Sequence, residues 1–112
     1  MNIIKTNIDQ SDKKAVYRLT KSESMQIQKV ERGTSIPVER YALYEEENSK
    51  GELQNVLAFT SGGMKFSTIS KTFIRSFMEC VELMENDPFS IIVTGGETKS
   101  GRGFVNCELN CD

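Results

Sequence analysis

The sequence lacks two residue types on which many functional sites depend. It contains no histidine and no tryptophan among its 112 residues. Without histidine, neither a Ser-His nor a Cys-His nucleophile pair can form, and no histidine can ligate a metal. The chain therefore offers no candidate nucleophile–base pair for an enzyme. We expect a protein that is not an enzyme and that carries no metal or other cofactor.

Long hydrophobic runs are absent as well. No stretch of consecutive apolar residues exceeds about four, whereas a membrane-spanning helix needs about 20. Residues 1–7 contain no apolar segment of the kind found in signal peptides. We therefore expect no membrane association and a cytoplasmic location, which would be the host cytoplasm for a viral protein.

Cysteine is scarce and odd in number, which favours a reducing compartment over a disulfide framework. Cys80 falls on the apolar side of a helical pattern, and Cys107 alternates with apolar residues. Both are expected to be small core residues, and Cys111 a free thiol. Cys107 and Cys111 could pair on a metal, but the chain offers no histidine and no CxxC pair to complete such a site.

The charge balance is slightly acidic, with 14 basic and 16 acidic residues. A strongly basic chain would indicate nucleic acid, and this one does not. Acidic residues gather in 45–47 and again at Glu79, Glu82, Glu85 and Asp87. Neither set lies among residues that would desolvate one carboxylate and leave its neighbour charged, so acid–base catalysis is not expected.

The first third of the chain gives weak patterns. Residues 1–11 are expected to form a loose polar arm. Residues 13–20 alternate Ala15, Tyr17 and Leu19 with polar neighbours, which predicts a strand. Residues 25–30 predict a weaker strand.

The middle of the chain predicts a three-stranded meander. Residues 36–46, 53–60 and 64–69 are extended runs, separated by turn residues at 48–51 and 61–63. Ser61-Gly62-Gly63 is a strong signal for a tight hairpin.

The periodicity then changes to that of a helix. Phe73, Ile74, Phe77, Met78, Val81 and Met84 recur at spacings of three and four, which predicts an amphipathic helix over residues 71–85. Ser70 is expected to cap the start of this helix. Residues 86–88 are expected to end it, because Pro88 disfavours a helical conformation in the residue before it. Residues 89–94 and 104–109 predict two closing strands joined by a glycine-rich turn.

From residue 36 onward the order is three strands, one helix and two strands, within a single domain. This order is that of the five-stranded OB barrel, with its helix between the third and fourth strands. We expect a mainly β, OB-like core over residues 36–111, with one or two N-terminal strands added to an edge. An open α+β sheet with one helix on its face fits the same order.

The glycine-rich turn resembles a phosphate-binding loop only superficially. Arg102 and Gly103 stand where such a loop needs lysine and serine or threonine, and a strand rather than a helix follows. Nucleotide hydrolysis is therefore rejected. Two interpretations stay open: a flexible hairpin, or a clamp whose Lys99 and Arg102 contact phosphates.

Aromatic and basic residues on the predicted strands suggest a surface for single-stranded nucleic acid, which needs cations along the backbone and flat rings for the bases. Strand alternation would point Arg40, Tyr44 and Phe104 outward, near Lys99 and Arg102. The candidate phosphate contacts are Arg40, Lys65, Lys99 and Arg102, and the candidate stacking residues are Tyr44, Phe66 and Phe104.

The sequence resembles the small single-stranded-DNA-binding proteins of bacteriophages that infect Gram-positive bacteria. The resemblance rests on residues 40–44, 48–51, the helix from Phe73 to Met84, and residues 98–109, and it covers residues 36–111. A T-K-x-G-R-x-F/Y run leading into an apolar final strand is common in such proteins. The resemblance implies an OB fold that coats DNA during phage replication, without catalysis or cofactor.

We therefore expect binding of single-stranded DNA without sequence readout, by aromatic stacking and phosphate contacts. DNA and RNA are not distinguished by these features, and homo-oligomers and a replication or host protein partner stay open. The alternative is a small phage-encoded module that inhibits a host enzyme. In that case residues 45–47 and the acidic helix face would contact a basic partner.

Overall fold

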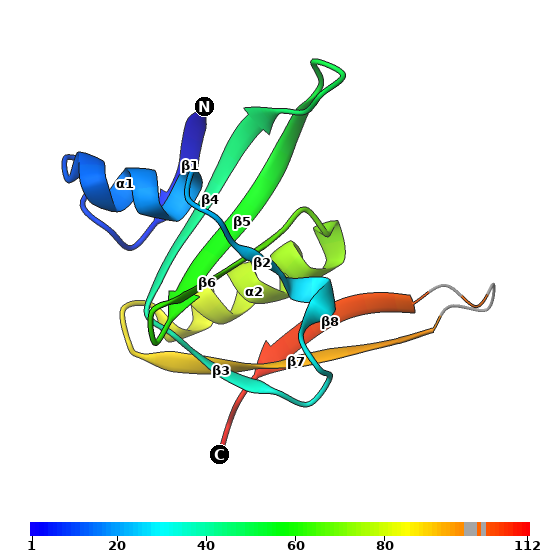
Figure 1. Ribbon diagram of the computed structural model, residues 1–112. Coiled ribbons are helices and arrows are strands. Elements are labelled where there is room, and N and C mark those ends of the chain that lie inside the picture. Colours follow the sequence, from blue (N-terminus) through cyan, green and yellow to red (C-terminus); the bar gives the residue numbers. More distant parts are fainter. Residues whose placement is uncertain (98–100, 102) are drawn as a thin grey trace.

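The computed structural model describes residues 1–97, 101 and 103–112, which form a mainly β chain with two α-helices (Figure 1). In chain order the elements are β1 (Asn2–Thr6), α1 (Lys13–Thr20), β2 (Met25–Gln26), the 3₁₀ helix η1 (Ile27–Lys29), β3 (Ser35–Val38), β4 (Arg40–Glu47), β5 (Leu53–Ser61), β6 (Met64–Thr68), α2 (Lys71–Met84), β7 (Phe89–Glu97) and β8 (Gly103–Leu109).

The strands form two sheets. The larger has the order β1-β4-β5-β6-β2, and the smaller has the order β3-β7-β8. The predicted meander is confirmed, because β5 pairs antiparallel with both β4 and β6. The long first strand of the prediction is divided at Glu39. Its first part, β3, pairs with β7, and its second part, β4, pairs with β5.

A closed barrel is not found among the described residues. Closure would need β6 to pair with β8, but the edge of β6 pairs instead with the short parallel strand β2. The 3₁₀ helix that follows, η1, contacts both β6 and β8, and its Ile27 is fully buried. The N-terminal region thus fills the space where the two sheets would meet.

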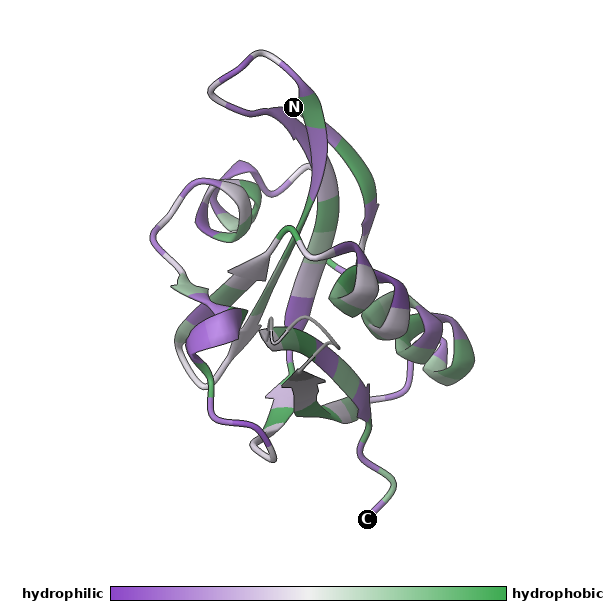
Figure 2. Ribbon diagram, turned by 90° about the vertical axis from the view of Figure 1, so that its right-hand side faces the viewer, coloured by the Kyte–Doolittle hydropathy of each residue, from purple (hydrophilic) through white to green (hydrophobic). Residues whose placement is uncertain are grey.

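The main core lies between the larger sheet, the smaller sheet and α2. Phe59 of β5 packs against Phe66, Phe73 and Phe77, with ring centroids 5.1 to 6.3 Å apart. Cys80 and Cys107 are buried in this core as predicted, and Cys111 is an exposed free thiol. Figure 2 shows hydrophobic and hydrophilic residues alternating around α2, as expected of a helix with one buried face.

The helix prediction is confirmed in its start and extent. The Ser70 side chain accepts a hydrogen bond from the Phe73 N–H at 3.2 Å, and α2 ends at Met84, shortly before Pro88. The closing strands are longer than predicted, because β7 continues to Glu97 and β8 begins at Gly103.

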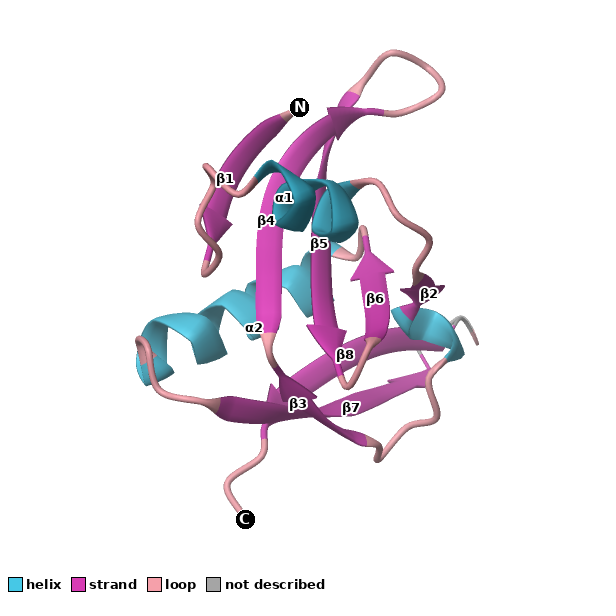
Figure 3. Cartoon of the chain, turned by 60° about the vertical axis from the view of Figure 1, so that its left-hand side comes forward, coloured by secondary structure: helices cyan, strands magenta, loops and turns pink. Residues whose placement is uncertain are grey.

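The prediction of a strand at residues 13–20 is wrong, because this segment is the helix α1. Asp12 caps it by accepting a hydrogen bond from the Ala15 N–H at 3.1 Å. Ala15 and Leu19, four residues apart, are both buried on one face of the helix. Leu19 joins a second, smaller core with Ala42, Tyr44, Val56 and Ala58. Figure 3 shows α1 crossing in front of β4 and β5, with α2 behind the sheet.

The N-terminal segment is also more ordered than predicted. Residues 2–6 form β1, which pairs antiparallel with β4, so the prediction of a loose arm over residues 1–11 is wrong for this part. The predicted strand at 25–30 is reduced to the two residues of β2. The expectation of added edge strands is confirmed, since β1 and β2 lie at the two edges of the larger sheet.

Candidate nucleic-acid interface

A cavity of about 380 Å³ lies between α1 and the end of the larger sheet. We call it the cationic cleft. It is lined by Ala15, Arg18, Leu19, Ser22, Glu23, Glu39, Arg40, Thr60, Gly63 and Lys65. Three of these side chains are cationic, and they come from three different elements: α1, β4 and β6.

Strand register brings two of the cations together. Arg40 of β4 lies opposite Thr60 of β5, and Thr60 lies opposite Lys65 of β6. Residues directly opposite one another across antiparallel strands share a face of the sheet. Arg40, Thr60 and Lys65 therefore form a row across this face, and α1 places Arg18 beside the row.

Lys65 is held in position by a contact with the segment that follows α1. Its Nζ donates a hydrogen bond to the carbonyl oxygen of Ser22 at 2.8 Å. Partial burial lowers the pKa of Lys65, and the nearby charge of Glu46 opposes this effect. The ammonium group has three donors, so it can contact an anion while it keeps this bond.

Two carboxylates moderate the positive charge of the cleft. Glu23 and Glu39 line it together with the three cations. Glu39 also accepts a hydrogen bond from the Gly62 N–H, which ties its carboxylate to the β5–β6 turn. The lining charge is thus one positive unit, three cations less two carboxylates. Chemically, the cleft can hold an anionic group such as a phosphate.

The structure brings together only some of the residues predicted for the site. Arg40 and Lys65 share the cationic cleft. Phe104 is 42% exposed but belongs to β8 in the smaller sheet, where its ring lies against Gly96 of β7. The predicted contacts Lys99 and Arg102 lie outside the described residues.

The prediction that Tyr44 points outward is wrong, because α1 covers the face of β4 that carries it. Tyr44 is only 3% exposed, and its hydroxyl donates a hydrogen bond to the Thr20 carbonyl at 3.2 Å. Burial, with a smaller effect of Glu46, raises the pKa of Tyr44 to about 12. Phe66 is also buried, with its ring stacked on Phe59. Stacking on a base needs an exposed ring face, which neither residue offers.

Arg18 was not among the predicted site residues, because its segment was expected to be a strand. The signal that could have identified it is the helix start: Asp12 is a favoured N-cap residue, and Ala15 and Leu19 stand four residues apart. A helix over this segment packs Ala15 and Leu19 on the sheet and places Arg18 beside the edge of the sheet.

No protein-family model, no curated protein and no solved structure matches the chain. No helix in the described part of the chain is long and apolar enough to cross a membrane. The described residues also contain no group of three or more carboxylate and cysteine side chains that could hold a metal ion.

Proposed function

We propose that the chain binds single-stranded nucleic acid without sequence readout, as an OB-like domain of the phage DNA-replication type. The observation that carries the proposal is the convergence of Arg18, Arg40 and Lys65 on one cleft. Arginine and lysine side chains contact the phosphate backbone whatever the bases are, and such contacts carry no sequence information.

The strand order supports the OB-like part of the proposal. The strand divided at Glu39 belongs to both sheets, as the first strand of an OB barrel does, and α2 stands between the third and fourth strands of the series. OB domains bind oligonucleotides on the face of their second and third strands. In this chain those strands are β5 and β6, which contribute Thr60 and Lys65 to the cationic cleft.

Stacking in this proposal falls to Phe104, which is exposed at the start of β8. Lys99 and Arg102, in the adjoining turn, stay part of the proposal on the evidence of the sequence. A net charge of −2 repels a polyanion, so affinity is modest at moderate salt and rises as salt is lowered.

Fluorescence anisotropy with labelled oligo-dT and a matched duplex, at several salt concentrations, tests the proposal. The double variant Arg40→Gln/Lys65→Gln should bind oligo-dT about tenfold more weakly. Its salt slope should fall by about 1.4, since each lost contact on a single strand removes roughly 0.7. Phe104→Ala should weaken binding about tenfold with the slope unchanged, because stacking is worth about 1–3 kcal/mol per base and releases no counterions.

Lys71→Gln/Arg75→Gln is the matched control. It removes one lysine and one arginine from exposed positions on α2, on the other side of the larger sheet. Oligo-dT binding by this variant should stay within about twofold of the wild type, because surface charges beyond about 10 Å are largely screened at 0.1 M salt. Absence of oligo-dT binding at low salt, or equal losses in the two double variants, would overturn the proposal.

A further inference from the structure

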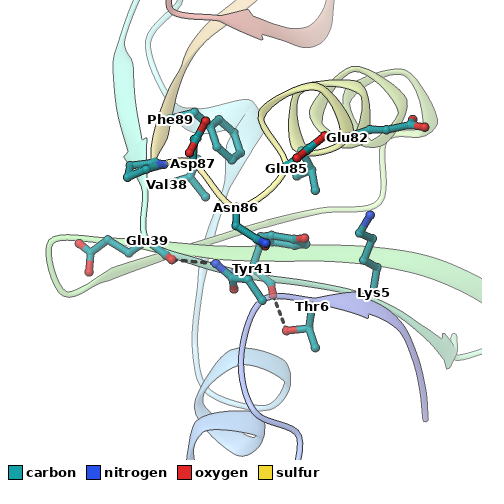
Figure 4. A pocket seen from close by; sticks show the side chains of 13 residues that line it. Lys5, Thr6, Val38, Glu39, Tyr41, Glu82, Glu85, Asn86, Asp87 and Phe89 are labelled. Atoms are coloured by element: carbon teal, nitrogen blue, oxygen red, sulfur yellow. Dashed lines mark hydrogen bonds between the residues drawn. The ribbon is translucent and has the colours of Figure 1, made fainter.

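A larger cavity, of about 810 Å³, lies between the end of β1, the junction of β3 and β4, and the C-terminal end of α2 (Figure 4). We call it the acidic groove and define it by Glu39, Tyr41, Glu82, Glu85, Asp87 and Phe89. Lys5 also lines it. The Glu39 carboxylate accepts its hydrogen bond from the Gly62 N–H and is turned away from the groove in Figure 4, so the carboxylates of Glu82, Glu85 and Asp87 and the ammonium of Lys5 give a lining charge of −2.

The carboxylates lie at the C-terminal end of α2, where negative charge destabilises a helix. The C-terminal end of a helix carries a partial negative charge and favours cations, by about 0.3–1 kcal/mol each. The last turn of α2 has no basic residue, and Glu82, Glu85 and Asp87 lie in or directly after it. Negative side chains and the negative helix end therefore face the same space, which gives it affinity for a cation.

Tyr41 provides a second and independent indication of a ligand. It is only 5% exposed, yet its hydroxyl makes no hydrogen bond within the described part of the chain. No fully buried side-chain oxygen or nitrogen there lacks a partner, so this hydroxyl reaches solvent through the groove. Figure 4 shows Tyr41 between the residues of β1 and those at the end of α2.

The floor of the groove suits an amphipathic cation rather than a metal ion. Val38, Tyr41 and Phe89 line the groove together with the carboxylates and supply apolar surface. In the described residues the carboxylates are not clustered closely enough to hold a metal. Lysine and arginine have a charged head on an apolar stem, which matches both parts of this lining.

Hydrogen bonds fix the wall of the groove before any ligand binds. Thr6 Oγ1 donates to the Tyr41 carbonyl at 2.6 Å. Asn7 Nδ2 donates to the Glu39 carbonyl at 3.0 Å, and this bond and the one from Thr6 are the dashed lines of Figure 4. The Tyr41 N–H donates to Asn7 Oδ1 at 2.8 Å. The backbone that carries Glu39 and Tyr41 is thus preorganised, which reduces the entropic cost of binding.

We propose that the acidic groove docks a lysine- or arginine-bearing segment of a partner protein. The cationic head lies among Glu82, Glu85 and Asp87, and Tyr41 Oη accepts one of its hydrogen bonds. The apolar stem packs on Phe89. This proposal is independent of nucleic-acid binding, because it uses none of the cations of the cationic cleft.

The test is an NMR titration of the ¹⁵N-labelled full chain with the acetylated, amidated peptide Ala-Lys-Ala-Lys-Ala-Lys-Ala, and with the same peptide carrying glutamine for lysine. The lysine peptide should shift the amide signals of Tyr41, Asp87 and Phe89, and the glutamine peptide should not. Glu82→Gln/Glu85→Gln should weaken peptide binding at least fivefold. Tyr41→Phe should weaken it about threefold without changing the charge of the groove.

Glu47→Gln/Glu52→Gln is the matched control, because it removes two exposed carboxylates at the far end of the β4–β5 hairpin. Peptide binding by this variant should stay within about 1.5-fold of the wild type. Equal weakening in the two double variants would overturn the proposal. Equal shifts of the same signals by spermidine would also overturn it, since they would indicate diffuse attraction of any cation.

Discussion

Glu85 has a backbone conformation that side chains rarely adopt. Its φ of 55° and ψ of −114° make it the one residue other than glycine with positive φ in the described chain. Such a conformation costs about 1–3 kcal/mol for a residue with a Cβ. We expect Glu85→Gly to raise the free energy of unfolding by about 1 kcal/mol, since glycine adopts this region without strain. Urea denaturation measures the change.

Two controls separate backbone strain from charge. Glu85→Gln removes the same carboxylate and keeps the Cβ, so its gain should be only a few tenths of a kcal/mol. Glu82→Gly places glycine inside α2, where it should cost about 1 kcal/mol. If Glu85→Gly were no more stable than Glu85→Gln, strain at this position would not be the cause.

At the scale of elements, α1 determines what the larger sheet can expose. Leu19 is 2% exposed and packs on the face of the sheet that carries Ala42 and Tyr44. We expect Leu19→Ala to lower the free energy of unfolding by about 2–3 kcal/mol, from lost burial and the cavity that remains. Tyr17→Ala, on the same helix but 63% exposed, should change it by less than about 0.5 kcal/mol.

Thermal and urea denaturation of both variants check this expectation. Equal effects of Leu19→Ala and Tyr17→Ala would contradict it, because they would mean that α1 does not pack on the sheet through one face.

The two helices show which elements a sequence reveals. In α2 the apolar residues repeat over fourteen residues, long enough for the helical period to be distinguished from alternation. The helix α1 has only eight residues. Ala15, Tyr17 and Leu19 fit the period of two of a strand, and Ala15 and Leu19 fit the spacing of four of a helix equally well. The pattern alone therefore does not distinguish a strand from a helix here. The cap at Asp12 was the remaining local evidence for a helix.

At the scale of the molecule, the sequence does not predict how segments far apart in the chain pack against one another. Alternation correctly assigned Arg40 and Tyr44 to one face of β4, but it could not show that α1 covers Tyr44 and leaves Arg40 exposed. Barrel closure likewise depends on whether β2 or β8 pairs with β6. No local pattern encodes such a choice, since it is decided by the packing of segments far apart in the chain.

The acidic groove and the cationic cleft are neighbouring surfaces of opposite charge, and Glu39 lines both. If the cationic cleft binds a nucleic-acid backbone, the carboxylates of the groove repel that backbone through solvent. This repulsion extends over about 30 Å at 0.01 M salt but only about 8 Å at 0.15 M. Neutralising the groove should therefore strengthen binding at low salt and leave it unchanged at physiological salt.

Glu82→Gln/Glu85→Gln should thus bind oligo-dT about two- to fourfold more tightly at 0.01 M salt, with a difference below about 1.5-fold at 0.15 M. Anisotropy titrations at both concentrations check this. A gain that persisted at 0.15 M would contradict long-range repulsion, because only direct contact between these carboxylates and the bound strand resists screening. The nucleic-acid path would then cross the groove, and the two charged surfaces would act as one site.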